Sequence, residues 1–315
     1  MNFRHHAVRD LAWVIGSPGI LSSGLIDRVS DHWCRIAFLD RVPWLRHLDN
    51  HPAELEMWLA QHQSSFLGHY FETLIAFWLT QWPRTQLLAW RLPLQGDERV
   101  LGEFDLLFYD RYCERHFHWE SAVKFFLRYR NEAGDEIWLG PNPRDTLTDK
   151  FQKIFGRQLR LSRQSEAAVL LQQYGITGLT PQAFFKGYLF YPAQSAWQQP
   201  SSVPPESSPT HLRGWWCYAS QPEQIPYVAN DSRWLSLERL RWLSPVFSHE
   251  REPGLPRAGL EALLARHFSG TDRPLLLAEL QPGSDGSWRE VNRGFVVPAH
   301  WPESNVSLPS DTMKS

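Results

Sequence analysis

The sequence predicts an α/β protein in which helices flank a mixed β-sheet. Two neighbouring runs, 100–108 and 117–125, alternate in side-chain character with the period of two that is typical of strands. Before them, apolar residues recur at the helical period through 64–82. A chain of 315 residues is long enough for one large domain or two small ones.

The composition indicates a globular chain with an extensive core. Hydrophobic residues make up 43% of the sequence and charged residues 21%. Sixteen tryptophans are dispersed along the chain, which is more typical of core packing than of a binding platform. The formal net charge of −2 argues against a protein that coats nucleic acid without specificity, while a local basic patch remains compatible with it.

The cysteines and the termini favour a cytoplasmic location. Cys34, Cys113 and Cys217 are far apart, so the sequence supports neither a zinc knuckle nor a disulfide framework. The first residues lack the apolar core of a signal peptide. No apolar run approaches the ~18 residues of a membrane span, so we expect no membrane association.

The N-terminal part is predicted to be helical. Apolar residues recur at helical spacing over 8–15, until the Ser-Pro-Gly sequence at 17–19 breaks the pattern. Further helices are predicted at 27–39 and 52–62, with Pro43 between them.

The clearest helix is predicted over 64–82. Ser64 or Ser65 is a candidate cap and Pro83 ends the pattern. Glu72 lies inside this helix, where a single glutamate is most simply interpreted as solvated. The apolar stripe consists of Phe66, Tyr70, Leu74, Phe77 and Trp78.

Acidic and basic side chains fall on defined faces of the predicted strands. The run 85–94 and the two runs after it are expected to form an antiparallel meander. Asp105 shares a strand face with Glu103, and Glu120 shares a face with Lys124. Metal-assisted phosphodiester hydrolysis uses carboxylates to hold the cation and a lysine to orient water or offset developing charge. The pattern therefore predicts a divalent-metal site.

A basic stripe follows on a predicted helix. After a polar loop at 131–145, capped by Asp145 or Thr146, a helix is expected to run to about residue 163. Gln158 falls at the edge of its apolar side. Such a stripe is most often a solvated face, and beside a metal site that hydrolyses phosphodiesters it would contact backbone phosphates. The stripe consists of Lys150, Lys153, Arg157 and Arg160.

The C-terminal half carries no recognisable chemistry. Strands are predicted at 181–191, 214–219, 275–280 and 289–297, and a helix at 259–268. The predicted division is an N-terminal helical segment (1–63), a core (64–192), a linker (193–211) and a C-terminal α+β extension (212–315).

Two histidine-containing groups look like metal ligands on paper. His116 and His118 share a strand face, which suits zinc, but without an evident third ligand a solvent-facing pair is the better interpretation. His47, Asp49 and His51 are placed in a polar, proline-bounded turn, where solvent exposure is again expected.

Three short stretches carry a resemblance to a known superfamily. The stretches 67–72 (LGHYFE), 102–105 (GEFD) and 120–124 (ESAVK) resemble the PD-(D/E)XK nuclease superfamily, in particular its Holliday-junction-resolvase-like and RecB-like members. This resemblance covers about residues 64–165 and implies a restriction-endonuclease-like core. The whole chain, with VRDLAW at 8–13, also resembles the uncharacterised bacterial family DUF1853.

The superfamily resemblance implies roles for individual residues. Glu72 matches the helix acid, Asp105 the metal-binding aspartate and Lys124 the catalytic lysine, while Glu120 is the nearest carboxylate on the same face. The implied cofactor is Mg²⁺ or Mn²⁺, held by Asp105 and Glu120 with Glu72 assisting. The acid that normally precedes the lysine by two residues is replaced by Ala122.

Two further positions on the basic helix are compared with RecB-like enzymes. Gln158 is similar to their helix glutamine, whereas Ser162 stands where a tyrosine is expected.

Three functional hypotheses follow. The first is a Mg²⁺-dependent phosphodiesterase that acts on DNA or RNA, with Lys150, Lys153, Arg157, Gln158 and Arg160 contacting nucleic acid. The second, motivated by Ala122, is a nuclease fold without catalysis that binds nucleic acid or protein. The third is a homodimer or partner surface formed by the Trp-rich N-terminal helices.

Overall fold

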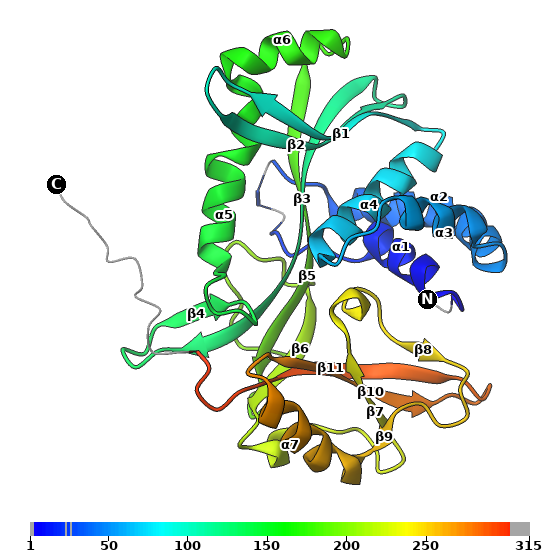
Figure 1. Ribbon diagram of the computed structural model, residues 1–315, viewed down its shortest axis with the longest axis vertical. Coiled ribbons are helices and arrows are strands. Elements are labelled where there is room, and N and C mark those ends of the chain that lie inside the picture. Colours follow the sequence, from blue (N-terminus) through cyan, green and yellow to red (C-terminus); the bar gives the residue numbers. More distant parts are fainter. Residues whose placement is uncertain (1–2, 23, 26, 303–315) are drawn as a thin grey trace.

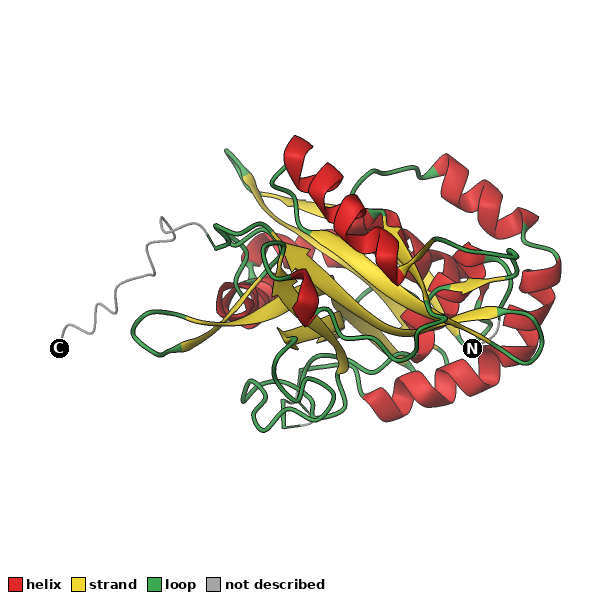
Figure 2. Cartoon of the chain, turned by 90° about the horizontal axis from the view of Figure 1, so that it is seen from below, coloured by secondary structure: helices red, strands yellow, loops and turns green. Residues whose placement is uncertain are grey.

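The computed structural model describes residues 3–22, 24–25 and 27–302, and within them eleven strands form one mixed sheet with helices on both faces (Figures 1 and 2). The strands are β1 (Thr85–Gln95), β2 (Val100–Asp110), β3 (Arg115–Arg130), β4 (Glu136–Leu139), β5 (Leu179–Pro192), β6 (Leu212–Tyr218), β7 (Arg233–Leu237), β8 (Phe247–Ser248), β9 (Leu255–Pro256), β10 (Leu275–Pro282) and β11 (Trp288–Val297). The prediction of a mixed sheet flanked by helices is confirmed.

The helices divide between the two faces of the sheet. They are α1 (His6–Gly16), α2 (Asp31–Asn50), α3 (Ala53–Gln61), α4 (Leu67–Gln81), α5 (Leu147–Gly156), α6 (Ser165–Gln173) and α7 (Leu260–Gly270). Short 3-10 turns are η1 (Gln158–Arg163), η2 (Pro222–Gln224), η3 (Arg239–Arg241) and η4 (Arg257–Gly259). Helices α1, α2 and α4 pack into the largest core on one face, whereas α5, η1, α6 and α7 cover the other.

The sheet is continuous from the N-terminal meander to the C-terminal strands. Its order is β1-β2-β3-β5-β6-β11-β10-β7-β9, with β4 added to β3 and β8 to β11. The predicted antiparallel meander β1-β2-β3 is present. Strand β5 then runs parallel to β3, β6 parallel to β5, and β11 parallel to β6. The C-terminal strands therefore extend the central sheet instead of forming a sheet of their own.

The segment 193–210 is a loop, as predicted, and it is anchored to the N-terminal part. The backbone N–H of Ser22 donates to the Glu206 carbonyl (2.7 Å), and that of Ser208 donates to the Ile20 carbonyl (2.6 Å). These bonds hold the loop against the segment between α1 and α2, so it does not behave as a spacer between separate bodies.

Tryptophans concentrate in the largest core. Trp33 contacts Trp119 edge-on with ring centroids 5.3 Å apart, and Trp78 stacks on Trp82 at 5.5 Å. Large aromatic rings bury much apolar area for each residue ordered, so they stabilise the contact between the N-terminal helices and the sheet. The prediction that the tryptophans serve packing is confirmed for these residues.

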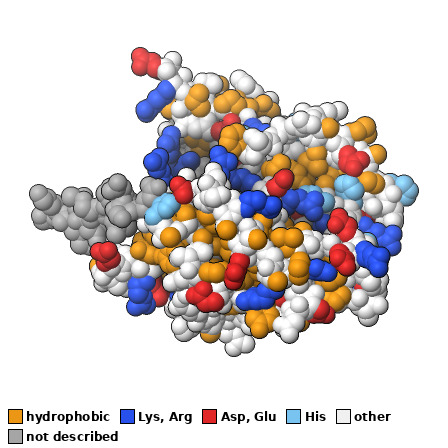
Figure 3. Space-filling model, turned by 60° about the horizontal axis from the view of Figure 1, so that its bottom comes forward, with side chains coloured by type: hydrophobic (Ala, Val, Ile, Leu, Met, Phe, Trp, Pro, Cys, Tyr) orange, Lys and Arg blue, Asp and Glu red, His pale blue; other side chains and the backbone are white. Residues whose placement is uncertain are grey.

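The N-terminal helices turn their tryptophans inward. Trp33, Trp44 and Trp58 pack against the largest core. The exposed apolar side chains on α2 and α3 are instead Ile36, Leu39 and Met57. The face shown in Figure 3, with the C-terminal part of the chain forward, intermixes basic, acidic and apolar side chains, in line with the small net charge.

Helix α2 contradicts the prediction of a break at Pro43. It runs from Asp31 to Asn50 with Pro43 inside it. Proline removes one helical hydrogen bond and normally kinks or ends a helix. Here the helix continues because residues on both sides of the proline, including Ala37 and Leu45, are buried in the same core.

The start of α4 and the loop after β3 also differ from the prediction. Phe66 occupies the N-cap position of α4 and no side chain caps it, so neither Ser64 nor Ser65 serves as the cap. The predicted loop 131–145 contains β4, which pairs with the end of β3. The sequence did not reveal this strand because its four residues are too few to show a period.

The predicted basic helix is split. Thr146 caps α5 by accepting from the Asp149 N–H (3.0 Å), as predicted, but α5 ends at Gly156 and a 3-10 turn follows. Glycine weakens a helix interior. At this break the chain turns so that Gln158 reaches the sheet. Helix α6, for which the sequence showed no clear signal, comes next.

We predict that Gly187→Ala destabilises the fold strongly. Gly187 on β5 has φ +140, and an added Cβ would overlap the Lys124 carbonyl on β3. Both strain and overlap therefore oppose the substitution, and we expect a loss of about 2 kcal/mol or more in the free energy of unfolding. The matched control is Gly178→Ala, where no atom lies within 4 Å. Equal denaturant midpoints for the two variants would contradict this account.

Candidate functional site

The candidate site lies where β2 separates from β3. Their pairing runs from Asp110–Arg115 to Leu106–Trp119 and stops there. Beyond it, the Ser121 backbone N–H donates to Asp105 Oδ2 (2.8 Å), and the Ser121 hydroxyl donates to the same oxygen (3.3 Å). The Asp105 carboxylate thus takes the place of a backbone carbonyl at the end of the ladder.

Strand β1 is irregular at the same level of the sheet. Arg91, in its middle, has φ +51, and its flanking residues Trp90 and Leu92 pack into cores on opposite faces. At this kink the Arg91 side chain reaches α4, where its Nε donates to Glu72 Oε2 at 2.8 Å. Glu72 is therefore held in an ion pair at the edge of the site.

Glu120 is the most deeply buried acid of the site, with 1% of its surface exposed. Gln158, at the start of η1, donates to Glu120 Oε1, whereas Glu120 Oε2 has no hydrogen-bond partner. The last β2–β3 pair, Leu106–Trp119, directs the next two residues, Asp105 and Glu120, toward each other. The structure thus brings two carboxyl groups and one amide together.

Burial and mutual repulsion keep this acid pair protonated over an unusual pH range. Burial, followed by the negative charge of Asp105, raises the pKa of Glu120 to about 9. Burial, followed by the charge of Glu72, raises the pKa of Asp105 to about 6. Two like charges at close range cannot both be ionised in a poorly solvated site without a compensating cation. Burial and the neighbouring negative charge therefore favour protonation of one carboxyl of the pair at neutral pH.

The basic side chain with the largest electrostatic effect on the acid pair is Lys150 of α5. It is half-buried, and burial lowers its pKa while the negative charge of Glu120 opposes that shift. Among the described residues, no ion pair within 4.0 Å joins Lys150 to an acid. Its ammonium group therefore interacts electrostatically with the carboxyls but forms no direct ion pair with them.

Lys124, which the superfamily resemblance implies as the catalytic lysine, lies beyond Glu120 along β3. Its Nζ forms an ion pair with Asp145 Oδ2 at 2.8 Å. Lys124 lies four residue steps along the strand from Glu120, which corresponds to about 13 Å. The structure thus brings Asp105, Glu120 and Gln158 together, with Lys150 within electrostatic range, and it pairs Lys124 with Asp145.

The rest of the predicted basic stripe is exposed beside this site. Lys153 projects from α5, whereas Arg157 and Arg160 follow the helix break. One guanidinium N–H of Arg157 donates to the Leu101 carbonyl (3.1 Å) on β2. The four basic residues thus border the site from two short elements instead of one helix.

Sequence reasoning assigned Lys150 only to phosphate contacts and gave Ser121 no role. No signal in the sequence placed Lys150 beside Glu120, because the two residues lie on different elements, 30 positions apart along the chain. In the structure, Lys150 lies close enough to Glu120 for the negative charge of that carboxyl to act on the pKa of the lysine.

The structure does not support a metal site at either histidine-containing group. His118 is fully buried, contrary to the expected exposure, with Nε2 4.0 Å from Glu120 Oε2, and burial lowers its pKa to about 4. His116 packs against the Tyr109 ring with centroids 4.9 Å apart. Asp49 accepts the backbone N–H groups of Arg4 and His5. Within residues 3–22, 24–25 and 27–302, no three His, Cys, Asp or Glu side chains are arranged to hold a metal ion.

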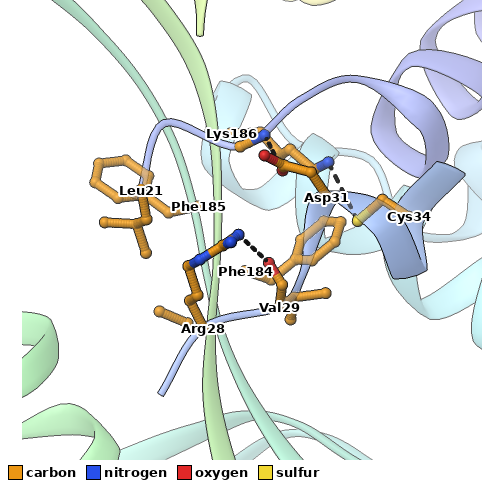
Figure 4. A pocket seen from close by; sticks show the side chains of 10 residues that line it. Leu21, Arg28, Val29, Asp31, Cys34, Phe184, Phe185 and Lys186 are labelled. Carbon is orange, nitrogen blue, oxygen red and sulfur yellow. Dashed lines mark hydrogen bonds between the residues drawn. The ribbon is translucent and has the colours of Figure 1, made fainter. Parts of the chain in front are cut away.

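A second buried lysine lies on the opposite face of the sheet (Figure 4). Lys186 of β5 is 2% exposed, donates to the Ser17 carbonyl, and lies 3.5 Å from Cys34 Sγ. Burial raises the pKa of the Cys34 thiol, although the nearby Lys186 acts in the other direction. Because strand side chains alternate, Lys186 points away from the face that carries Ala122 and its neighbour Phe185. It contributes to packing under α2 and not to the acid pair.

The fold and site define a mixed α/β protein that buries an acid pair in its sheet beneath a basic helix. The chain belongs to the family described as Domain of unknown function (DUF1853), whose family model matches residues 9–297. No curated protein and no solved structure matched the chain. Among the described helices, none combines the length and the apolar character needed to cross a membrane.

We predict that Glu120→Gln stabilises the protein only at higher pH. The pKa of Glu120 is raised from 4.5 to about 9, so its contribution to stability is complete below pH 4.5 and is lost as the pH rises toward 9. Gln cannot ionise and retains an acceptor for Gln158. We expect equal melting temperatures at pH 4.5 and a gain of about 3 °C or more for the variant at pH 8.5.

The control for this series is Glu103→Gln, since Glu103 is exposed on the same strand as Asp105. We expect its melting temperature to follow that of the unsubstituted protein throughout. The same difference between Glu120→Gln and the unsubstituted protein at both pH values would show that Glu120 ionises normally.

Proposed function

We propose that the protein is a divalent-metal-dependent nuclease with a PD-(D/E)XK-like site, which hydrolyses phosphodiester bonds of DNA or RNA. The observation that carries this proposal is the buried pair Asp105 and Glu120 at the end of the β2–β3 ladder, held by Ser121 and Gln158, with Lys150 within electrostatic range. Buried carboxylates near an ammonium group are a combination that phosphoryl chemistry uses.

The residues of the pair fit a hard cation such as Mg²⁺ or Mn²⁺. Mg²⁺ is usually bound through one or two carboxylates and keeps several waters, so a third protein carboxylate is not needed. Glu120 Oε2 is buried without a hydrogen-bond partner, as a ligand atom would be before binding. Asp105 and Glu120 would hold the cation, which supplies Lewis-acid activation of water and of the phosphate oxygens. Glu72 would assist only when released from Arg91.

The protein's own groups then have distinct tasks. Lys150 offsets the negative charge that develops on the phosphate, and its pKa, lowered by burial, also suits it to orient the attacking water. Ser121 fixes the Asp105 carboxylate through two hydrogen bonds, and Gln158 fixes Glu120. The exposed Lys153, Arg157 and Arg160 contact backbone phosphates, which supports binding without reading sequence.

We predict that Asp105→Asn and Lys150→Met each reduce cleavage of nucleic acid by about 100-fold or more, because each removes one charge of the reacting centre. Asn preserves the acceptor for Ser121, and Met preserves the length of the side chain. The measurement is cleavage of labelled single-stranded and duplex DNA and RNA with Mg²⁺ or Mn²⁺.

Lys124→Met is the matched control for Lys150→Met. Because Lys124 is engaged by Asp145, we expect its loss to reduce cleavage far less. Full cleavage by Lys150→Met together with loss in Lys124→Met would assign the ammonium role to Lys124. Full cleavage by Asp105→Asn would end the nuclease proposal altogether.

A second candidate is a nuclease-like fold that binds nucleic acid without cleaving it. The ion pair of Glu72 with Arg91 favours this alternative, since it occupies the third carboxylate of the superfamily pattern. Calorimetric titration with Mn²⁺ separates the two. Heat that disappears in Asp105→Asn supports the enzyme, whereas no heat with the unsubstituted protein supports the binding module.

A further inference from the structure

A cavity of about 420 Å³ lies on the far flank of α5, between that helix, β4 and the loop segment 203–206. We call it the α5–β4 pocket. Trp138 of β4 and Phe151 and Phe155 of α5 contribute aromatic walls, and two prolines of the loop close it. Its volume lies in the range of small-molecule sites.

We propose that the α5–β4 pocket binds one unpaired nucleobase of a nucleic-acid strand whose phosphates contact the basic flank of α5. This inference rests on the proposed function and adds a substrate class to it, namely strands with unpaired bases. A base held in a duplex cannot enter a concave pocket without leaving its stack.

The aromatic walls are held rigid from behind and remain open toward the pocket. Trp138 contacts Tyr191 edge-on with centroids 5.2 Å apart, and Phe151 contacts Phe185 edge-on at 5.9 Å. All three wall rings are only partly buried, unlike most tryptophans of this chain. Rigid, partly exposed rings are the platforms on which bases stack, and each stacked base contributes about 1–3 kcal/mol.

The polar rim of the pocket matches the edge of a base. Gln152 is exposed at the rim and offers both an amide donor and an acceptor. Glu136 and Glu206 offer carboxylate acceptors suited to the exocyclic amino groups of bases. Arg130 forms an ion pair with Glu136 at 3.0 Å, so this carboxylate adds little net repulsion toward nearby phosphates.

The pocket and the basic side chains occupy different sides of one helix. With 3.6 residues per turn, Gln152 lies about 160° around α5 from Lys150, and Phe155 lies about 160° from Lys153. A strand that crosses α5 can therefore place phosphates on the basic side and a base in the pocket. Its next phosphates then lead toward Asp105 and Glu120.

The test measures binding without cleavage. Fluorescence anisotropy in EDTA compares a single-stranded oligonucleotide with a hairpin duplex of the same composition. We expect Trp138→Leu and Gln152→Ala to weaken single-strand binding by about fivefold or more, with duplex binding unchanged. Lys153→Ala should weaken both and lower the salt dependence by about one ion.

Phe66→Ala is the matched control, because Phe66 is 63% exposed at the start of α4, far from the pocket in the fold. Melting temperatures identify any variant that fails to fold. If Trp138→Leu fails to fold, Gln152→Ala still tests the proposal, because Gln152 is exposed. Unchanged single-strand affinity in Gln152→Ala and in a folded Trp138→Leu would overturn the proposal. Equal loss for single strand and duplex would do the same.

Failure of the pocket and failure of the nuclease are distinguishable. If Asp105→Asn cleaves normally but Trp138→Leu loses single-strand binding, the pocket stands without the proposed catalytic site. If cleavage depends on Asp105 while the pocket variants bind normally, the nuclease stands and the substrate class does not.

Discussion

The hydrogen bond from the Ser121 backbone to the Asp105 carboxylate is the contact on which the candidate site depends. It satisfies a buried N–H at the point where β2 leaves β3, so the ladder ends without an orphaned donor. The divergence makes room for two side chains between strands. Because the acceptor is a carboxylate and not a carbonyl, one interaction both ends the sheet contact and positions an acid.

The buried acid pair carries an electrostatic cost that the rest of the fold must offset. Burying Asp105 and Glu120 side by side costs free energy unless a proton or a cation neutralises one of them. The contacts that hold them, from Ser121 and Gln158, come from a strand and from the 3-10 turn after α5. The break of the basic helix at Gly156 is therefore part of the site's construction, since a continuous helix would carry residue 158 along the helix axis.

Much of the central architecture could be predicted from the sequence. The meander and the helix around Glu72 have clear periods of two and 3.6, and period is a local property. What could not be predicted depends on contacts distant in sequence. Helix α2 continues through Pro43 because its flanking residues are buried, and β4 is too short to show a pattern. The proximity of Asp105 and Glu120 could be predicted from their places on neighbouring strands, whereas Lys150 comes from another element, which no spacing rule on β3 reveals.

The continuity of the sheet has a consequence for how the chain behaves as a unit. The parallel strands β5 and β6 join the meander to the C-terminal strands, and each supplies backbone partners to the next. Ending the chain after β5 would leave an inner strand edge without partners and uncover apolar surface. The C-terminal strands therefore cannot be removed without destabilising the part of the sheet that carries the acid pair. The family model covers both parts together, over residues 9–297.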